Sequence, residues 1–209
     1  MKLVYISNTS QTTKKAHGVQ IAKMCEALVD RGAEVELILP DRSKKVQRGD
    51  FFTFYGIERN FRLTKLPVLD LVKFGRLGFV LTSLSFGLAL KKYLRNKEFD
   101  VLYSRDPVSV FFISNLGIPI YFEAHKLPDN FLARSAIRKV NGIVSITSNL
   151  AADIKKTAHR HSLNVLIAPD GVDLKLFDIN ISKNEARRRL GLPLDKKIAV
   201  YSGNLNFEW

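Results

Sequence analysis

The sequence predicts an α/β protein in which helices cover both faces of an open parallel sheet. Short apolar runs rich in β-forming residues alternate with helical patterns over residues 2–168, and this alternation is typical of such a sheet. Of the 209 residues, 46% are hydrophobic and 25% are charged, which is globular usage and excludes wholesale disorder. The length is enough for one fair-sized domain, or for one domain and part of another.

The first forty residues predict a strand, a loop, a helix and a second strand. Residues 2–6 form a short apolar run, and residues 7–18 are polar. Apolar side chains then recur at helical spacing from Ile21, with Gly32 as the stop, and residues 35–39 form the next apolar run. A strand, a helix and a strand in this order indicate parallel pairing through a right-handed crossover.

The alternation continues along the chain. Strands are predicted at 51–57, 62–66, 100–103, 118–122, 143–146, 165–168 and 197–202. Helices are predicted at 108–115, 131–140 and 150–159, and at 69–97 with breaks near Gly75 and Gly78. Ser182 and Glu185 have the spacing of a capping box, which predicts another helix that ends at Gly191. We expect the last strand to be the first strand of a truncated second domain.

Charge and cysteine content limit the kinds of partner and site. Lys and Arg number 33 against 20 Asp and Glu, and the net charge of +13 favours an anionic partner. The one cysteine, Cys25, excludes a disulfide framework, and it falls on the apolar stripe of the first helix. The longest uncharged run, residues 77–90, is shorter than the roughly 20 residues that span a bilayer. We therefore expect a soluble or peripheral cytoplasmic protein.

Residues that follow the predicted strands are the first candidates for a binding site, because ligands of open parallel sheets bind at the carboxyl ends of the strands. Gly18 precedes the first helix, where a glycine lets a phosphate approach the free N–H groups of the helix. A surface loop with a glycine at the helix entry explains Gly18 equally well. No G-x-G-x-x-G pattern is present, which disfavours a dinucleotide site.

Further candidates follow the later strands. Arg105 follows one predicted strand, and Glu123 and His125 follow the next. An acid and a histidine at the end of a strand are able to bond a polyol or to assist proton transfer. The alternative is that Glu123 pairs with a cation such as Arg105 and that His125 packs against the next loop. Thr147 fits a helix cap and Asp170 fits an Asp-Gly turn, each at the same edge of the sheet.

The segment 61–99 combines basic and apolar residues. It holds eight basic and two acidic residues among many Leu and Phe, and its candidate contacts to a membrane or an acceptor are Lys73, Arg76, Lys91 and Lys92. Such a stretch is able to lie on an anionic membrane surface, or it is a core helix with a solvated basic face. No nucleic-acid-binding signature accompanies the charge, so we expect no nucleic-acid partner.

Six segments together have the order and spacing of a known family. They are KKAHGVQIAKMCEALVDRGAEVELILP, VLYSRDP, YFEAHKLP, NGIVSITSNLAADI, NVLIAPDGVDLKLFD and LGLPLDKKIAVYSGNL. The first five resemble the glycine loop, first helix, middle strands and last strands of the N-terminal domain of group 1 (family 4) glycosyltransferases of the GT-B fold. The sixth resembles the crossover into the second domain of that family. The resemblance covers nearly the whole chain.

The resemblance implies two Rossmann-like domains that face each other across a cleft. The N-terminal domain would bind mainly the acceptor, and the C-terminal domain would hold a UDP- or GDP-sugar donor, whose sugar is transferred with retention and with no metal or other cofactor. By the resemblance, Gly18 lies where a backbone amide meets the donor diphosphate, and His125 lies where a histidine contacts the donor sugar. Gly203 lies in the loop after the first strand of the second domain.

We therefore predict an acceptor-side domain at 1–180, and a linker helix with the start of a donor-binding domain at 181–209. The expected function is that of a nucleotide-sugar-dependent glycosyltransferase with a glycan or lipid-linked acceptor, peripheral on the inner face of the plasma membrane. The basic residues and paired glutamates of the family's second domain are absent from the sequence, so we expect this chain alone to be inactive. The alternatives are a non-catalytic acceptor- or membrane-binding module, or an oxidoreductase, which the missing glycine pattern disfavours.

Overall fold

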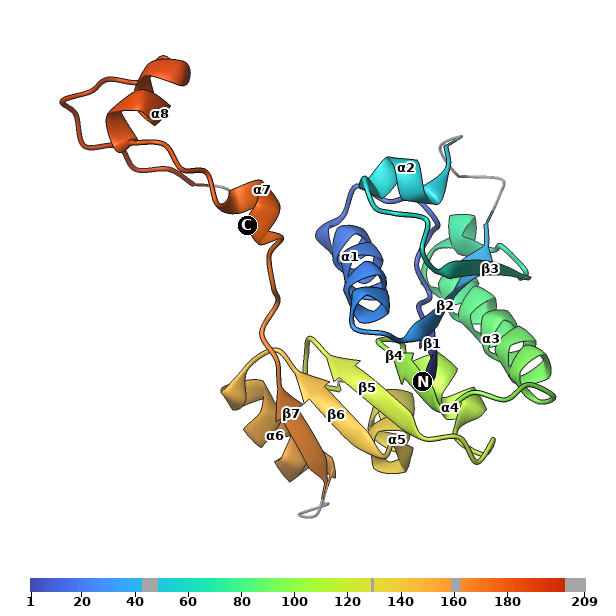
Figure 1. Ribbon diagram of the computed structural model, residues 1–209. Coiled ribbons are helices and arrows are strands. Elements are labelled where there is room, and N and C mark those ends of the chain that lie inside the picture. Colours follow the sequence, from blue (N-terminus) through green and yellow to red (C-terminus); the bar gives the residue numbers. More distant parts are fainter. Residues whose placement is uncertain (43–48, 129, 159–162, 202–209) are drawn as a thin grey trace. The chain divides into compact units, whose positions relative to one another are not determined.

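The computed structural model describes residues 1–42, 49–128, 130–158 and 163–201 (Figure 1). The chain divides into two compact units, Met1–Asp170 and Gly171–Trp209. The assignment of functional domains to 1–180 and 181–209 stays a prediction. Gly203 lies outside the described residues.

The first unit is built on one seven-stranded sheet in which every neighbouring pair of strands is parallel, as predicted. Its order is β3-β2-β1-β4-β5-β6-β7. The strands are β1 (Lys2–Ile6), β2 (Glu34–Asp41), β3 (Arg62–Pro67), β4 (Val101–Ser104), β5 (Ile120–Ala124), β6 (Gly142–Ser145) and β7 (Asn164–Ile167). The helices are α1 (Ala16–Asp30), α2 (Phe51–Tyr55), α3 (Gly75–Leu94), α4 (Pro107–Ile113), α5 (Phe131–Lys139) and α6 (Ser148–Ala158), with the 3-10 turn η2 (Val72–Phe74) before α3.

The chain starts in the middle of the sheet, and this decides which face each helix covers. It moves from β1 to β2 and β3 in one direction, and from β4 to β7 in the other, so right-handed crossovers place the connecting helices on opposite faces. Helices α1 and α2 pack on one face in a cluster that includes Tyr5 and Leu37, and α3 to α6 pack on the other around Val4 and Leu102 (Figure 1). The direction reverses between β1 and β4, where ligands of such sheets bind.

The strand predicted at 51–57 is wrong, because these residues form the short helix α2. The carboxylate of Asp50 accepts a hydrogen bond from the backbone N–H of Thr53, 3.0 Å away, and so caps the start of the helix. Gly56 ends it in the left-handed conformation, with φ of 60°. The buried rings of Phe51 and Phe52 pack in the same apolar cluster as Tyr5 and Leu37. Capping and packing therefore outweigh the strand preference of aromatic residues.

Other predicted boundaries differ locally from the structure. The helix breaks at Gly75 as predicted, but Gly78 lies inside α3, where a Cβ would collide with the carbonyl of Leu71. Helix α1 begins at Ala16, so Gly18 lies in its first turn and not before it. Of the strand predicted at 197–202, residues 197–201 have irregular structure, since no described strand accepts their backbone hydrogen bonds.

By length and composition, Val72–Leu94 would be able to cross a membrane. Its inner face, however, belongs to the core of the first unit. Phe86, Leu90 and Leu94 are almost completely buried and pack with β1, β4 and β5 residues in one cluster. We therefore treat α3 as a core helix whose other face is open to its surroundings.

The second unit contains the helices α7 (Leu174–Phe177) and α8 (Lys183–Arg189). The Ser182 hydroxyl accepts a hydrogen bond from the backbone N–H of Glu185 at 3.2 Å, which confirms the predicted start of α8. The helix ends two residues before Gly191, whose φ of 63° suits the end of a helix.

Candidate functional site

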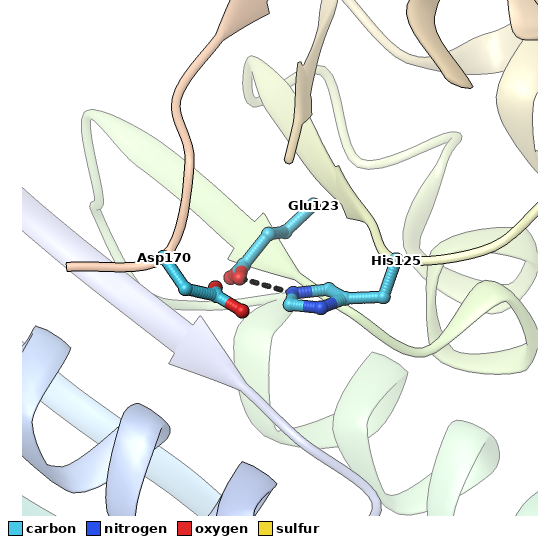
Figure 2. Close-up of side chains that lie close together, drawn as sticks. All are labelled: Glu123, His125 and Asp170. Atoms are coloured by element: carbon cyan, nitrogen blue, oxygen red, sulfur yellow. Dashed lines mark hydrogen bonds and ion pairs between the residues drawn. The ribbon is translucent and has the colours of Figure 1, made fainter. Parts of the chain in front are cut away.

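His125 and Glu123 form a hydrogen-bonded pair at the carboxyl edge of the sheet. Glu123 is the fourth residue of β5 and its side chain is only 4% exposed, whereas His125 follows the strand and its side chain is 23% exposed. The Nε2 atom of His125 lies 2.6 Å from Oε1 of Glu123 (Figure 2). The strand was predicted to end before Glu123, but in the structure Glu123 lies within the strand and not in the loop after it.

Three side chains from other elements hold the Glu123 carboxylate. The hydroxyl of Tyr5, in the central strand β1, donates to Oε2 at 2.7 Å. The amide of Gln20, in the second turn of α1, donates to Oε1 at 3.2 Å, and Nε of Arg105 lies 4.0 Å from the same oxygen. Burial raises the pKa of Glu123, but the hydrogen bonds from His125 and Tyr5 and the charge of Arg105 outweigh this effect. The net pKa lies below its usual value, so Glu123 is ionised near neutral pH.

The ionised carboxylate decides which nitrogen of His125 carries a hydrogen. Because a carboxylate only accepts hydrogen bonds, Nε2 must donate to Glu123. In the neutral ring, Nδ1 is then an acceptor with its lone pair available to a ligand hydroxyl. The pair is therefore able to orient a sugar hydroxyl or to take a proton from one.

Gln20 connects Arg105 and Asp170 to this pair. Its Oε1 accepts from Nη1 of Arg105 at 2.6 Å, and its Nε2 donates to Oδ1 of Asp170, which follows β7. Four of the predicted residues, Arg105, Glu123, His125 and Asp170, thus meet at one place. Glu123 lies in β5, and the other three follow β4, β5 and β7. The predicted pairing of Glu123 with Arg105 is present alongside the bond to His125.

Glu123, His125 and Asp170 also have the spacing of metal ligands, with one ligand atom from each within 4.8 Å of the others (Figure 2). The oxygens of Glu123 already accept hydrogen bonds from Tyr5, Gln20 and His125. A cation would have to displace these donors and lie close to the guanidinium of Arg105. The donor set therefore suits a hydrogen-bond network better than a metal ion, and an enzyme that needs no metal stays a prediction.

Two other predicted residues have clear roles within the fold. Gly18 is buried against the β1–α1 loop, and a Cβ there would collide with the hydroxyl of Tyr55 and the methyl group of Thr13. The hydroxyl of Thr147 accepts from the backbone N–H of Leu150 at 3.2 Å and so caps α6. Contact of Gly18 or Thr147 with a ligand stays a prediction.

Sequence reasoning missed Tyr5 and Gln20. A tyrosine in a central strand is a useful signal, because a buried phenol normally needs a hydrogen-bond partner. Gln20 is a polar residue near the start of α1, the end of the helix that faces the carboxyl edge of the sheet. The partner of both is Glu123, more than one hundred residues further along the chain.

Comparison with known proteins indicates which class of protein has this sequence and fold. A stretch of 73 residues is 33% identical to TuaC of Bacillus subtilis (strain 168), which is described as a teichuronic acid biosynthesis glycosyltransferase. The match covers 34% of this chain and 18% of TuaC.

Solved structures share the fold over most of this chain. Sucrose-phosphate synthase (tll1590) from Thermosynechococcus elongatus superposes with a TM-score of 0.69 at 15% identity, over 93% of this chain and 53% of its own. The lipopolysaccharide outer core galactosyltransferase WaaB gives 0.56 at 12%, over 83% and 47%. A UDP-GlcNAc 2-epimerase from Methanocaldococcus jannaschii gives 0.57 at 13%, over 91% and 52%. At these identities the likeness shows the GT-B-like fold alone, and this chain spans about half the length of these structures.

The family comparison is more specific than the shared fold. Residues 17–176 match the model of Glycosyltransferase Family 4, and this range contains Gln20, Arg105, Glu123, His125 and Asp170. Since the match takes in well over half of the chain, the resemblance seen in the sequence is confirmed: this chain belongs to glycosyltransferase family 4 and forms a GT-B N-terminal domain.

Proposed function

We propose that this chain is the acceptor-side part of a glycosyltransferase that moves a sugar from a UDP- or GDP-sugar to a glycan or lipid-linked acceptor, with retention. The observation that carries the proposal is the His125–Glu123 pair at the carboxyl edge, with Arg105 and Asp170 joined to it through Gln20. A histidine held by an ionised, buried carboxylate is suited to orient a sugar hydroxyl. No metal takes part in the proposed reaction.

The names of similar proteins support this substrate class. TuaC is described as acting in teichuronic acid biosynthesis, and WaaB as a galactosyltransferase of the lipopolysaccharide outer core. The epimerase acts on UDP-GlcNAc by its title, so a UDP-sugar occurs on this fold even outside the transferases. A donor-binding second domain would supply most of the stabilisation of the leaving diphosphate, which is usually a large part of catalysis. We therefore expect the 209-residue chain by itself to release no nucleoside diphosphate.

The test is turnover by the natural protein at its full length. A panel of UDP- and GDP-sugars is screened for nucleoside diphosphate release with glycan and lipid acceptors, and His125→Ala is compared with the wild type. We expect turnover to fall on the order of 10²-fold or more with an unchanged melting temperature. Leu127→Ala is the matched control, because Leu127 is an exposed residue of the same loop. A stable, fully active His125→Ala enzyme would contradict the proposal.

A second property of the proposed enzyme is attachment to the inner face of the plasma membrane. The face of η2 and α3 that is turned away from the sheet exposes the apolar residues Phe74, Leu77, Val80, Leu81 and Leu88, and the side chain of Leu77 is 79% exposed. Lys73 and Arg76 lie beside the first of these, and Lys91 and Lys92 lie in the last turn of α3. Apolar side chains flanked by cations suit a bilayer with anionic headgroups, where each cation contributes about 1 kcal/mol.

Vesicle co-sedimentation tests this attachment. We expect the protein to bind vesicles of phosphatidylcholine mixed with phosphatidylglycerol, to prefer them to pure phosphatidylcholine, and to lose binding in high salt. Lys73→Glu with Arg76→Glu should abolish the preference. Lys155→Glu with Lys156→Glu, at the end of α6, makes the same charge change elsewhere and should keep it. Equal binding to both kinds of vesicle, or to neither, would contradict this attachment to anionic lipids. Helix α3 would then be a core helix with a solvated basic face.

A further inference from the structure

A cavity of about 490 Å³ lies at the carboxyl edge of the sheet, beside the Glu123 network. Its walls include Lys15 and His17 at the start of α1, Arg42 after β2, and Arg105 after β4. Phe79 of α3 lines it as well. Arg105 belongs to both places, since it lines the cavity and its Nε lies 4.0 Å from Glu123.

The charge in this cavity is mainly positive. Lys15, Arg42 and Arg105 come to it from three separate segments of the chain. Within the described part of the chain, Asp106 is the one carboxylate that lines it. The Oδ2 atom of Asp106 already accepts from the backbone N–H and the hydroxyl of Ser109, at 3.0 and 2.5 Å, as the cap of α4. The cavity thus holds more cationic donors than the chain itself pairs.

Arg42 gives the clearest sign that an acceptor is missing. Its Nη2 donates to Oδ1 of Asn8 at 2.6 Å, but its Nε is buried and has no hydrogen-bond partner among the described residues. Burial lowers the pKa of Arg42, and the charges of Asp70 and Asp106 offset this only in part. A buried donor without an acceptor is costly, so an oxygen atom from a ligand would be favourable here.

The start of α1 adds to the positive electrostatic potential in the cavity. Lys15 occupies the cap position without forming a side-chain cap, and the first turn has no acidic residue. The free N–H groups and the positive end of the helix dipole are therefore not neutralised by the chain's own side chains. Together with the buried Nε of Arg42, which has no hydrogen-bond partner among the described residues, this favours a compact ligand with several negative oxygens.

We propose that this cavity binds a phosphoryl group carried by the acceptor. The assignment to the acceptor rests on the proposed function, in which this domain holds the acceptor beside His125. Phe79 supports it, because Phe79 joins the cavity to α3, where Leu77 and Val80 are exposed. The anionic group and an apolar carrier would then lie on adjoining surfaces of one site.

Titration of the natural full-length protein with inorganic phosphate tests the proposal, at constant ionic strength and with chloride as the reference anion. We expect phosphate to bind in preference to chloride. Arg42→Gln should weaken phosphate binding about tenfold or more, and Lys15→Gln several-fold, because each removes a charged donor. Lys15 is exposed, so its variant tests the cavity even if Arg42→Gln does not fold. Arg95→Gln is the matched control, since exposed Arg95 ends α3 away from the cavity and should leave the affinity unchanged.

Two results would overturn the proposal. One is phosphate affinity that is the same in Arg42→Gln, Lys15→Gln and the wild type, or no preference over chloride. The other is competition between UDP and phosphate, which would assign the cavity to the donor diphosphate. Phosphate binding that UDP leaves unchanged supports the acceptor. Because the titration needs no turnover, intact phosphate binding without sugar transfer would contradict the proposed function only.

Discussion

Two buried glutamates lie in the same sheet, in strands that are separated by β1 and β4, and they differ in the side chains that they bind. Glu123 of β5 and Glu36 of β2 are 4% and 7% exposed. Each accepts a hydrogen bond from a tyrosine hydroxyl, from Tyr5 at 2.7 Å and from Tyr93 at 2.5 Å. Each also has an arginine within ion-pair distance.

The two glutamates differ in their other hydrogen-bond and ion-pair partners. Glu36 accepts from the hydroxyl of Thr64, and its arginine, Arg62, is a largely exposed side chain. Each of these hydroxyls, of Thr64 and of Tyr93, donates its hydrogen to Glu36, and neither side chain carries a basic nitrogen. Glu123 holds His125, whose ring keeps a second nitrogen for a ligand. Burial of a carboxylate therefore does not identify a site; the chemistry of the side chain that it orients does.

The size of a cavity, like the burial of a carboxylate, does not identify a site. Glu36 borders a cavity of about 730 Å³ at the amino edge of the sheet, with residues such as Lys2 and Arg59. This cavity is larger than the one of about 490 Å³ at the carboxyl edge. The loops that leave the carboxyl ends of β1 and β4 turn in opposite directions and leave a crevice between them, where ligands of open parallel sheets bind. The proposed site therefore lies at the carboxyl edge, where the smaller cavity adjoins the Glu123 network through Arg105.

The largest expected difference between the two glutamates is in turnover. Glu123→Gln removes the ionised partner that makes Nε2 of His125 the donor, and we expect kcat of the full-length enzyme to fall about 10- to 100-fold, the size of effect known for carboxylates that orient a metal-bound histidine. Glu36→Gln should leave kcat within about twofold of the wild type. Steady-state kinetics of the two variants measures this. Equal losses in both would show that burial alone, and not His125, makes Glu123 important.

The second expected difference is in stability. Glu36→Leu leaves the hydroxyls of Tyr93 and Thr64 without their acceptor, and we expect the free energy of unfolding to fall by about 1–3 kcal/mol. Adding Tyr93→Phe removes one of the unpaired groups and should restore part of the loss. Urea unfolding of Glu36→Leu, of Tyr93→Phe and of the double variant checks this. If the double variant is as unstable as the sum of the single changes, the hydroxyl at Tyr93 is not paired with Glu36 as the structure has it.

The smallest expected effect is on acid stability. The pKa of Glu123 is lower in the folded chain than its ordinary value of 4.5, so the unfolded chain takes up a proton first as pH falls. The stabilisation is complete above that ordinary value and is lost as pH falls through the folded pKa. Glu123→Gln should therefore lose less stability than the wild type between neutral pH and pH below 4.5. Identical pH profiles of urea unfolding would place the pKa of Glu123 at its ordinary value.

Much of the fold was predictable from local patterns. Strand β1 has the predicted bounds, because a buried parallel strand is a nearly continuous apolar run. The edge strands β3 and β7 are less buried, and their bounds agree with the prediction to within one residue. Helix α2 was not predictable in this way, since its aromatic residues favour strands locally and only the cap at Asp50 and packing against α1 make it helical. The strand predicted at 197–202 shows the same dependence on neighbours.

The sequence by itself determined the α/β class, the family and the strand ends that carry Arg105, Glu123, His125 and Asp170. These follow from short-range patterns, because the carboxyl ends of parallel strands meet at one edge whatever the details of packing. Only the tertiary structure decided that Gln20 joins three of these residues, that Tyr5 supports Glu123 and that Arg42 has a buried donor without an acceptor. A hydrogen bond depends on direction and on distances within a few tenths of an ångström, and partners separated by dozens of residues leave no local pattern that would specify them.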